Sequence, residues 1–298
     1  MSLVPTILSP PHCVWPAGAE LGEGPVWSQS RQALFWVDIL GKKLHCYSPR
    51  GSGARTWSFD EEISVVAERE NHDSLIVALR HGFAFFDPAS AELEKIVDVE
   101  SERAKNRFND GKCDSRGRLW AGSMDFAGAQ PTGALYSLDA QRNCVRHVDG
   151  FAITNGPTWS LDGRTLYFTN TATARIFAFD FDLEQGALSN QRLWAKFAQA
   201  DGSPDGMTTD AEGRLWIAHW GAGCVTCHAP TGEELARIEL PASNTTSCAF
   251  GGPDLKTLYI TSACTDLDKH QRKQQPLAGG LFEVELDVQG LPAARFAG

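Results

Sequence analysis

Four oxygen-bearing side chains recur beside glycine in short, similar stretches of the sequence. Glu23 lies in "EGPVWS", Asn109 in "NDGKCD", Asn155 in "NGPTWS" and Asp205 in "DGMTTD". Carboxylate and amide oxygens are the ligands that hard divalent cations such as Ca²⁺, Mg²⁺ or Mn²⁺ bind in proteins. A cation held by three or four such ligands keeps open positions and could act as a Lewis acid. Each residue taken alone could equally be a turn residue, because Asn, Asp and Gly are common in turns.

The elements around these residues repeat along the chain. Short apolar or alternating segments, separated by Gly, Asp, Asn and Pro, predict strands rather than helices. At intervals of 41, 43, 47, 49 and 43 residues, equivalent strands are centred on Trp36, Val77, Trp120, Tyr167, Trp216 and Tyr259. A period in the forties, with about four strands per unit, is typical of a β-propeller. The sequence therefore predicts an all-β fold, a six-bladed β-propeller with four-stranded antiparallel blades.

A single domain spanning residues 1–298 is expected, because no linker, low-complexity tract or composition shift divides the chain. The segment of about residues 1–15 is expected to help close the ring by pairing strands from the two ends. Two seven-stranded sandwiches would also be all-β, but they would not explain six equivalent strands.

The four polar residues share one phase of this repeat, since each precedes the central residue of its strand by 11 to 13 positions. In a propeller the residue before each innermost strand lies near the central axis, so we expect the four side chains to converge there. Two carboxylates in a partly desolvated channel repel each other, and a divalent cation would remove that cost. In the two remaining blades, small polar residues around Ser64 and around Ser247–Cys248 occupy the equivalent position of the repeat.

Composition argues against several classes of partner. The chain has 27 basic and 37 acidic residues, a net charge of −10, which disfavours nucleic acid or an anionic membrane as the main partner. The N-terminus "MSLVPTILSPPHCVWP" is a poor signal peptide, because it lacks a basic region and prolines break its apolar run. No run approaches the roughly 18 apolar residues of a membrane helix. Eight scattered cysteines are too dilute for a disulfide scaffold, so we expect a cytoplasmic protein. We also expect no obligatory protein partner.

Other motifs favour structural roles. Cys224 and Cys227 have CxxC spacing, but strand alternation would point their sulfurs to opposite faces, so buried structural thiols are expected. His219 is expected to be packed or at the surface, Trp36 to lie in the core between blades, and Asp38 to cap a turn. The sequence contains no G-x-S-x-G elbow, P-loop or dinucleotide fingerprint, so serine hydrolase, kinase and dehydrogenase readings have no support.

Longer stretches of the sequence resemble the SMP-30/gluconolactonase/regucalcin family. The matching stretches run in the family's order from about residue 20 to the C-terminus. They are "LGEGPVW", "FWVDI", "RFNDGKCD", "GRLWAGSM", "GALYSLD", "TNGPTWSLDGRTLYFTN", "SPDGMTTDAEGRLWIAHWG" and "SCAFGGPDLKTLYITSA". The resemblance implies a six-bladed propeller that hydrolyses sugar lactones with a divalent metal ion.

Site roles also follow from the resemblance. It implies that Glu23, Asn155 and Asp205 bind the metal and that Asp205 is also the general base. It further implies that Asn109 lies beside them and that Arg107 contacts substrate oxygens; the alternative for Arg107 is a surface salt bridge. The segment "DFAGAQPTG", residues 125–133, lacks the paired acidic residues that some relatives carry there, which leaves the preferred sugar open.

The expected function is metal-dependent hydrolysis of a small-molecule sugar lactone to the aldonic acid, in carbohydrate catabolism. The sugar, the ring size and the choice among Ca²⁺, Mg²⁺, Mn²⁺, Zn²⁺ and Fe²⁺ stay open. The alternatives are a non-catalytic calcium-binding or regulatory protein, a propeller used as a protein-interaction platform, and a hydrolase of other esters on the same metal scaffold.

Overall fold

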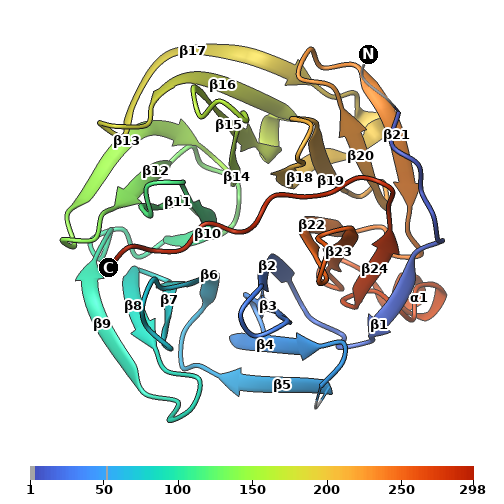
Figure 1. Cartoon of the computed structure of the whole chain (residues 1–298), viewed down its shortest axis with the longest axis horizontal. Coiled ribbons are helices and arrows are strands. Elements are labelled where there is room, and N and C mark those ends of the chain that lie inside the picture. Colours follow the sequence, from blue (N-terminus) through green and yellow to red (C-terminus); the bar gives the residue numbers. More distant parts are fainter. Residues whose placement is uncertain (1–3, 52) are drawn as a thin grey trace.

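Six four-stranded sheets surround a central channel in the computed structural model, which describes residues 4–51 and 53–298 (Figure 1). The strands within every sheet are antiparallel, so the predicted six-bladed propeller is confirmed. Helical structure in the described ranges is limited to two single turns, η1 (Thr171–Thr173) and η2 (Gln199–Asp201), and to helix α1 (Lys269–Gln274). Within the same ranges, no helix is long and apolar enough to cross a bilayer.

Each blade runs from a strand at the channel to a strand at the rim. The innermost strands are β2 (Gly22–Ser28), β6 (Ile63–Glu68), β10 (Asn106–Cys113), β14 (Thr154–Trp159), β18 (Ser203–Thr209) and β22 (Thr245–Gly251). The second strands are β3 (Ala33–Asp38), β7 (Leu75–Leu79), β11 (Leu119–Asp125), β15 (Thr165–Asn170), β19 (Leu215–Trp220) and β23 (Thr257–Ser262). The third strands are β4 (Lys43–Ser48), β8 (Gly82–Phe86), β12 (Gly133–Leu138), β16 (Arg175–Asp182), β20 (Cys224–His228) and β24 (Leu281–Glu285). The outermost strands are β5 (Gly53–Ser58), β9 (Leu93–Asp98), β13 (Cys144–Phe151), β17 (Ala187–Lys196), β21 (Glu234–Glu239) and β1 (His12–Trp15).

The sixth blade takes strands from both ends of the chain. Strand β1 pairs with β24 in antiparallel register, with His12 opposite Glu283, and supplies the outermost strand of the sheet β1-β24-β23-β22. These strands lie more than 260 residues apart in the chain, and their pairing closes the ring (Figure 1).

The repeated motif D-x-x-G-R-L-W forms a turn that one buried carboxylate holds together. In the fifth blade, Asp210 Oδ1 accepts hydrogen bonds from the main-chain N–H groups of Glu212 (2.9 Å) and Arg214 (3.0 Å). Its Oδ2 accepts from Arg214 Nε (2.7 Å) and from Trp216 Nε1 (2.9 Å). Asp114 receives the equivalent four bonds in the third blade. The motif therefore recurs because it fixes both the turn and the tryptophan of the next strand.

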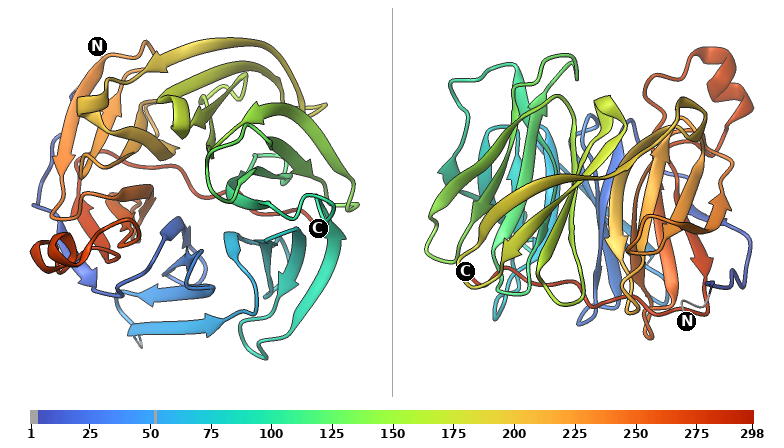
Figure 2. Two further views of the ribbon diagram at one scale, coloured as in Figure 1. Left: turned by 180° about the vertical axis from the view of Figure 1, so that it is seen from behind. Right: turned by 90° about the horizontal axis from the view of Figure 1, so that it is seen from above.

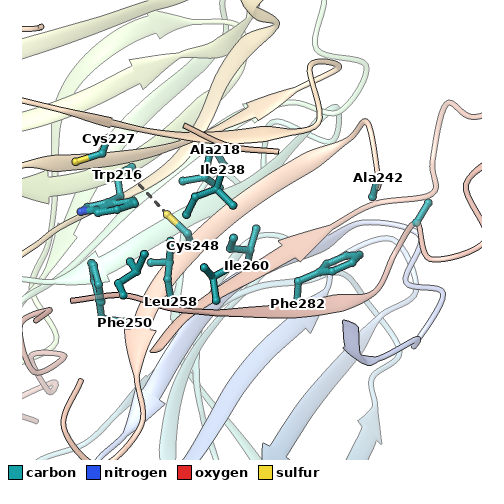
Figure 3. Packing of buried hydrophobic residues seen from close by; sticks show 14 of the residues in the cluster. Trp216, Ala218, Cys227, Ile238, Ala242, Cys248, Phe250, Leu258, Ile260 and Phe282 are labelled. Atoms are coloured by element: carbon teal, nitrogen blue, oxygen red, sulfur yellow. Dashed lines mark hydrogen bonds between the residues drawn. The ribbon is translucent and has the colours of Figure 1, made fainter. Parts of the chain in front are cut away.

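The apolar core consists of six clusters, one at each interface between neighbouring blades. Figure 3 shows the cluster between the fifth and sixth blades, where Trp216 packs against Phe250 and the Cys248 thiol donates to the Trp216 carbonyl (3.5 Å). Trp36 is fully buried in the cluster between the first and sixth blades, which confirms its expected core role. The aromatic or aliphatic residue of each second strand repeats because every blade has to bury the same interface.

The C-terminal segment, residues 286–298, crosses the face of the ring opposite to α1 (Figure 2). It forms a bridge to the fifth blade between Gly290 and Asp210, and a bridge to the second blade between Phe296 and Arg69. The Phe296 side chain is fully buried in the cluster between the second and third blades, 6.2 Å from the Phe85 ring. The segment thus links separate blades and covers a cavity of about 220 Å³ at this end of the channel.

We expect Phe296→Ala to lower the free energy of unfolding by about 3–5 kcal/mol, because it empties a well-packed site between two blades. Leu291→Ala in the same segment is the matched control, since the Leu291 side chain is 43% exposed. Chemical denaturation of the two variants measures the difference. Equal losses would show that the Phe296 ring does not contribute to holding the blades together.

Candidate metal centre and active site

The residues picked out by their phase in the repeat lie at β-bulges of four innermost strands. We expected them just before these strands, and this detail is wrong: they lie inside β2, β10, β14 and β18. A bulge inserts extra residues into one strand and turns a side chain away from its regular direction. The register shifts between Glu23 and Val26, Phe108 and Asp110, Asn155 and Thr158, and Pro204 and Met207.

A pocket of about 430 Å³ opens over these bulges, within the size range of small-molecule sites. All five residues assigned by resemblance line it, namely Glu23, Arg107, Asn109, Asn155 and Asp205. No residue of the C-terminal segment 286–298 lines this pocket, in contrast to the cavity that the segment covers.

A chain of hydrogen bonds orients the amides at the base of the pocket. Arg107 Nη1 donates to Asn109 Oδ1 (2.6 Å), and Asn109 Nδ2 donates to Asn155 Oδ1 (3.1 Å). Asn155 Nδ2 donates to the Thr171 hydroxyl (2.8 Å), which donates to the Pro204 carbonyl (2.8 Å). Sequence reasoning missed Thr171, whose only signal was a polar residue directly after the strand "TLYFTN". The bonds direct Asn155 Oδ1 into the site, where its second lone pair is available.

Two carboxylates are buried beside these amides. Glu23 is 2% exposed and Asp205 is 5% exposed. Glu23 Oε2 accepts a hydrogen bond from the Gly24 N–H (2.8 Å), and no ion pair neutralises either carboxylate within residues 4–51 and 53–298. Burial raises the pKa of Glu23 well above its ordinary value, and the charges of Asp205 and Asp110 raise it further. Burial and the charge of Asp110 likewise raise the pKa of Asp205.

Asp110 is a third buried carboxylate, which sequence reasoning also missed although it directly follows Asn109. Its Oδ1 accepts from the Gly111 N–H (2.7 Å) and its Oδ2 from the Gly156 N–H (2.8 Å). Burial raises the pKa of Asp110 to about 6, against the opposing charge of Lys112. Because both oxygens are engaged by the main chain, Asp110 holds the bulge glycine of the neighbouring blade and lies outside the pocket wall.

The oxygens of Glu23, Asp205 and Asn155 fit a hard divalent cation. Two buried carboxylates, opposed only in part by the charge of the nearby Arg107, can balance most of a charge of 2+, and the amide oxygen adds a neutral ligand. The part of the chain that the structure describes contains no cluster of three or more His, Cys, Asp or Glu side chains able to hold a metal. Glu23, Asp205 and Asn155 would supply three protein ligands to a cation, which leaves further positions for small molecules.

Arg107 lies beside these ligands and is 5% exposed, so a surface salt bridge does not describe it. Its Nη1 also donates to the Phe108 carbonyl (2.9 Å), and its guanidinium lies 5.6 Å from the centre of the Phe126 ring. Its Nε has no hydrogen-bond partner among the described residues. Burial lowers the pKa of Arg107 to about 10, so the side chain that lines the pocket is cationic at neutral pH.

The sequence of this chain matches a model of a known protein family. The family model described as the SMP-30/gluconolactonase/LRE-like region matches residues 21–264, which include the five pocket residues. The chain belongs to the SMP-30/gluconolactonase/LRE-like family. The resemblance inferred from the sequence is thereby confirmed.

Relatives in the SMP-30/gluconolactonase/LRE-like family match nearly the whole chain. YvrE of Bacillus subtilis, named as a sugar lactone lactonase, is 38% identical over 281 residues, covering 94% of this chain and 96% of its own. Regucalcin of Xenopus laevis is 36% identical over 294 residues, covering 96% and 98%. A solved structure of a calcium-binding protein, regucalcin from Agrobacterium tumefaciens, has a TM-score of 0.92 at 28% identity, covering 96% and 97%.

The other polar motifs of this family member are structural. Asp38 Oδ1 accepts from the Gly41 N–H across the turn (2.9 Å) and from the N–H of the distant Leu21 (2.9 Å), and the first bond confirms its role as a turn cap. His219 is fully buried and bonded to the Thr226 hydroxyl (2.7 Å), so it is packed and does not reach the pocket. Cys224 and Cys227 are buried free thiols, as expected.

We expect added Ca²⁺ to stabilise the protein more at pH 8 than at pH 5. A buried carboxyl with a raised pKa favours folding below its ordinary pKa of about 4, and this contribution is lost as the pH rises through the raised value. For Asp110 that value is about 6, and burial shifts the pKa of Glu23 and of Asp205 in the same direction. The metal-free protein therefore loses stability over this interval, while ionised ligands bind the cation better.

Thermal unfolding with chelator and with excess Ca²⁺, at both pH values, measures this difference. Asp205→Asn should reduce the pH dependence of the metal effect, since it removes one of the buried carboxyls. An equal gain from Ca²⁺ at pH 5 and pH 8 would contradict the assignment of these carboxylates to the cation.

Proposed function

We propose that this protein hydrolyses a small sugar lactone to its aldonic acid with the help of one divalent metal ion. The observation that carries the proposal is a pair of buried carboxylates next to an amide oxygen, in a pocket that is also lined by a buried arginine. The family membership, and the name of YvrE as a sugar lactone lactonase, support the same reaction class. A role in carbohydrate catabolism is part of the proposal.

Glu23, Asn155 and Asp205 would hold the metal, which when bound supplies Lewis-acid polarisation of the lactone carbonyl. Asp205 accepts the proton of the attacking water as general base, because its carboxylate lines the pocket and has no cationic side chain bound to it. The hydroxide adds to the carbonyl carbon, the ring C–O bond then breaks, and the proton held by Asp205 passes to the departing ring oxygen, which leaves the hydroxy acid.

Arg107 and Asn109 give the site more than metal binding requires. A buried cation next to a metal ion weakens metal binding by repulsion, so a purely structural ion site would be better without it. Arg107 lines the pocket with a positive charge, and its Nη1 bond holds Asn109 in place. Fixed donors of this kind stabilise negative charge that grows on a carbonyl oxygen, or bind ring hydroxyls.

The second candidate function is non-catalytic calcium binding. It is favoured by relatives named regucalcin, one of which is described as a calcium-binding protein. The same three oxygen ligands would serve this function, whereas the open pocket and Arg107 would be idle.

The deciding experiment is a pH-indicator assay of lactone hydrolysis on chelator-stripped protein, with Ca²⁺, Mg²⁺, Mn²⁺, Zn²⁺ and Fe²⁺ restored one at a time. The panel contains gluconolactone, xylonolactone, arabinolactone, galactonolactone and an aryl ester, each corrected for spontaneous opening. Hydrolysis of some lactones that depends on added metal is the expected result. Metal binding without hydrolysis of any substrate would reject the proposal in favour of calcium binding, and hydrolysis of the aryl ester alone would favour a general esterase.

A further inference from the structure

We propose that one side of the pocket selects lactones that carry a methyl group where ordinary aldonolactones carry a hydroxymethyl group. This apolar wall consists of Met124, Phe126, Ala127, Gly128 and Ile153, all of which line the pocket. The inference deepens the proposed lactone hydrolysis and rests on it for the identity of the ligand. The selectivity itself is inferred from the geometry of the apolar wall.

Hydrogen bonds hold the loop that carries the wall in one conformation. Asp125 Oδ2 accepts from the main-chain N–H groups of residues 129 (2.9 Å) and 130 (3.1 Å), so this carboxylate is used within the loop. The Phe126 N–H donates to the Lys105 carbonyl (2.7 Å), and the Thr132 hydroxyl donates to Asn106 Oδ1 (2.7 Å). The one acidic residue of the 125–133 segment therefore faces the loop and offers no acceptor to a ligand in the pocket.

The Phe126 ring is fixed although it is 39% exposed. The guanidinium groups of Arg80 and Arg107 lie 5.2 Å and 5.6 Å from its centre, within the range of cation–π contacts. Gly128 packs so closely on Ile153 that an added Cβ would come within 2.9 Å of Ile153 Cδ1. The wall thus spans the third and fourth blades as a preformed apolar surface, and ordering it on binding costs little entropy.

The rest of the pocket lining is mixed: it includes the apolar residues Leu21, Leu40, Ala172 and Trp220, and a polar rim of four side chains. Thr171, Ser203, Thr265 and Asp266 line the pocket from the fourth, fifth and sixth blades. A lactone whose carbonyl lies between Asp205 and Arg107 can therefore direct ring hydroxyls to this polar rim and a carbon substituent to the apolar wall. A hydroxyl placed against the wall would leave water without finding an acceptor, whereas a methyl group gains from burial there.

The test uses lactone pairs that differ only by methyl against hydroxymethyl: L-rhamnono- with L-mannono-1,4-lactone, and D-fucono- with D-galactono-1,4-lactone. We expect kcat/KM to be about 10-fold higher for the methyl member, a usual magnitude for a hydrophobic subsite. Phe126→Asn should bring this ratio close to one, while Phe126→Leu keeps most of it. Leu193→Asn is the matched control, because Leu193 is 53% exposed on strand β17, outside the pocket.

A binding assay separates failure of this inference from failure of the proposed function. Calorimetry on the Ca²⁺-loaded protein compares 1,5-anhydro-L-rhamnitol with 1,5-anhydro-L-mannitol, cyclic ethers that cannot be hydrolysed. Tighter binding of the first, lost in Phe126→Asn and kept in Leu193→Asn, supports the apolar wall even if no lactone is hydrolysed. Equal or tighter binding of the hydroxymethyl member, no binding of either, or a methyl preference that survives Phe126→Asn overturns the inference.

Discussion

Asp205→Asn is expected to reduce kcat/KM for lactone hydrolysis by at least about 10³-fold while the protein stays folded. The amide has the same shape as the carboxylate, but it can neither accept the proton of the attacking water nor balance the charge of the metal. Folding should survive because the variant removes a buried carboxylate whose pKa burial raises, and so lessens repulsion with Asp110. Initial rates at saturating metal, together with the unfolding midpoint of the metal-free protein, measure the two effects.

Asp201→Asn is the matched control. Asp201 lies four residues earlier, its side chain is 41% exposed, and its nearest ion-pair partner is Arg237 at 3.6 Å. Hydrolysis in this variant should stay close to that of the unmodified protein. Near-normal rates in Asp205→Asn, with metal bound, would remove Asp205 from its role as general base.

Arg107→Met is expected to lower kcat/KM by about 10²–10³-fold and, at the same time, to tighten metal binding. The loss follows because the variant removes the positive charge that lines the pocket and leaves Asn109 Oδ1 without its partner at 2.6 Å. The gain in metal affinity follows because the Arg107 charge interacts with the buried carboxylates Glu23 and Asp205 and would repel a cation between them. Changes of opposite sign separate a substrate-binding role from a merely structural one.

Arg80→Met controls for the loss of a guanidinium near Phe126. Arg80 stacks on the same ring, but it lies outside the pocket wall and forms its ion pair with Glu62 (3.6 Å). Calorimetric titration with Ca²⁺ and steady-state kinetics on both variants give the comparison. Weaker metal binding in Arg107→Met, or hydrolysis that matches Arg80→Met, would assign Arg107 to structure instead of substrate.

The blade count and the main site residues could be read from the sequence for a physical reason. Every blade buries the same kind of interface, so Trp36, Trp120 and Trp216 recur at nearly constant spacing in the second strands. A polar residue at a constant distance from such a position comes to the same point of the channel. Glu23, Asn109, Asn155 and Asp205 were therefore predictable as a group, and the resemblance assigned their roles.

The tertiary structure decided what depends on contacts between distant segments. Asp110 bonds to Gly156, 46 residues later, and Thr171 bonds to the carbonyl of Pro204, 33 residues later. Neither pairing leaves a local signal in a repeat whose strands look alike. The bulges also depend on pairing, because an inserted residue is defined only by the strand opposite it.

The apolar wall of the pocket and the path of the C-terminal segment also depend on contacts between distant segments. The sequence by itself determined a ring of six blades with two carboxylates and two amides at its axis. Only the folded chain decided that Phe126 is held over the pocket by Arg80 and Arg107, and that the last residues cross the opposite mouth to bury Phe296. A hydrophobic pattern records which residues are buried, whereas the partner of an exposed ring or a terminal segment depends on where the other blades place their surfaces.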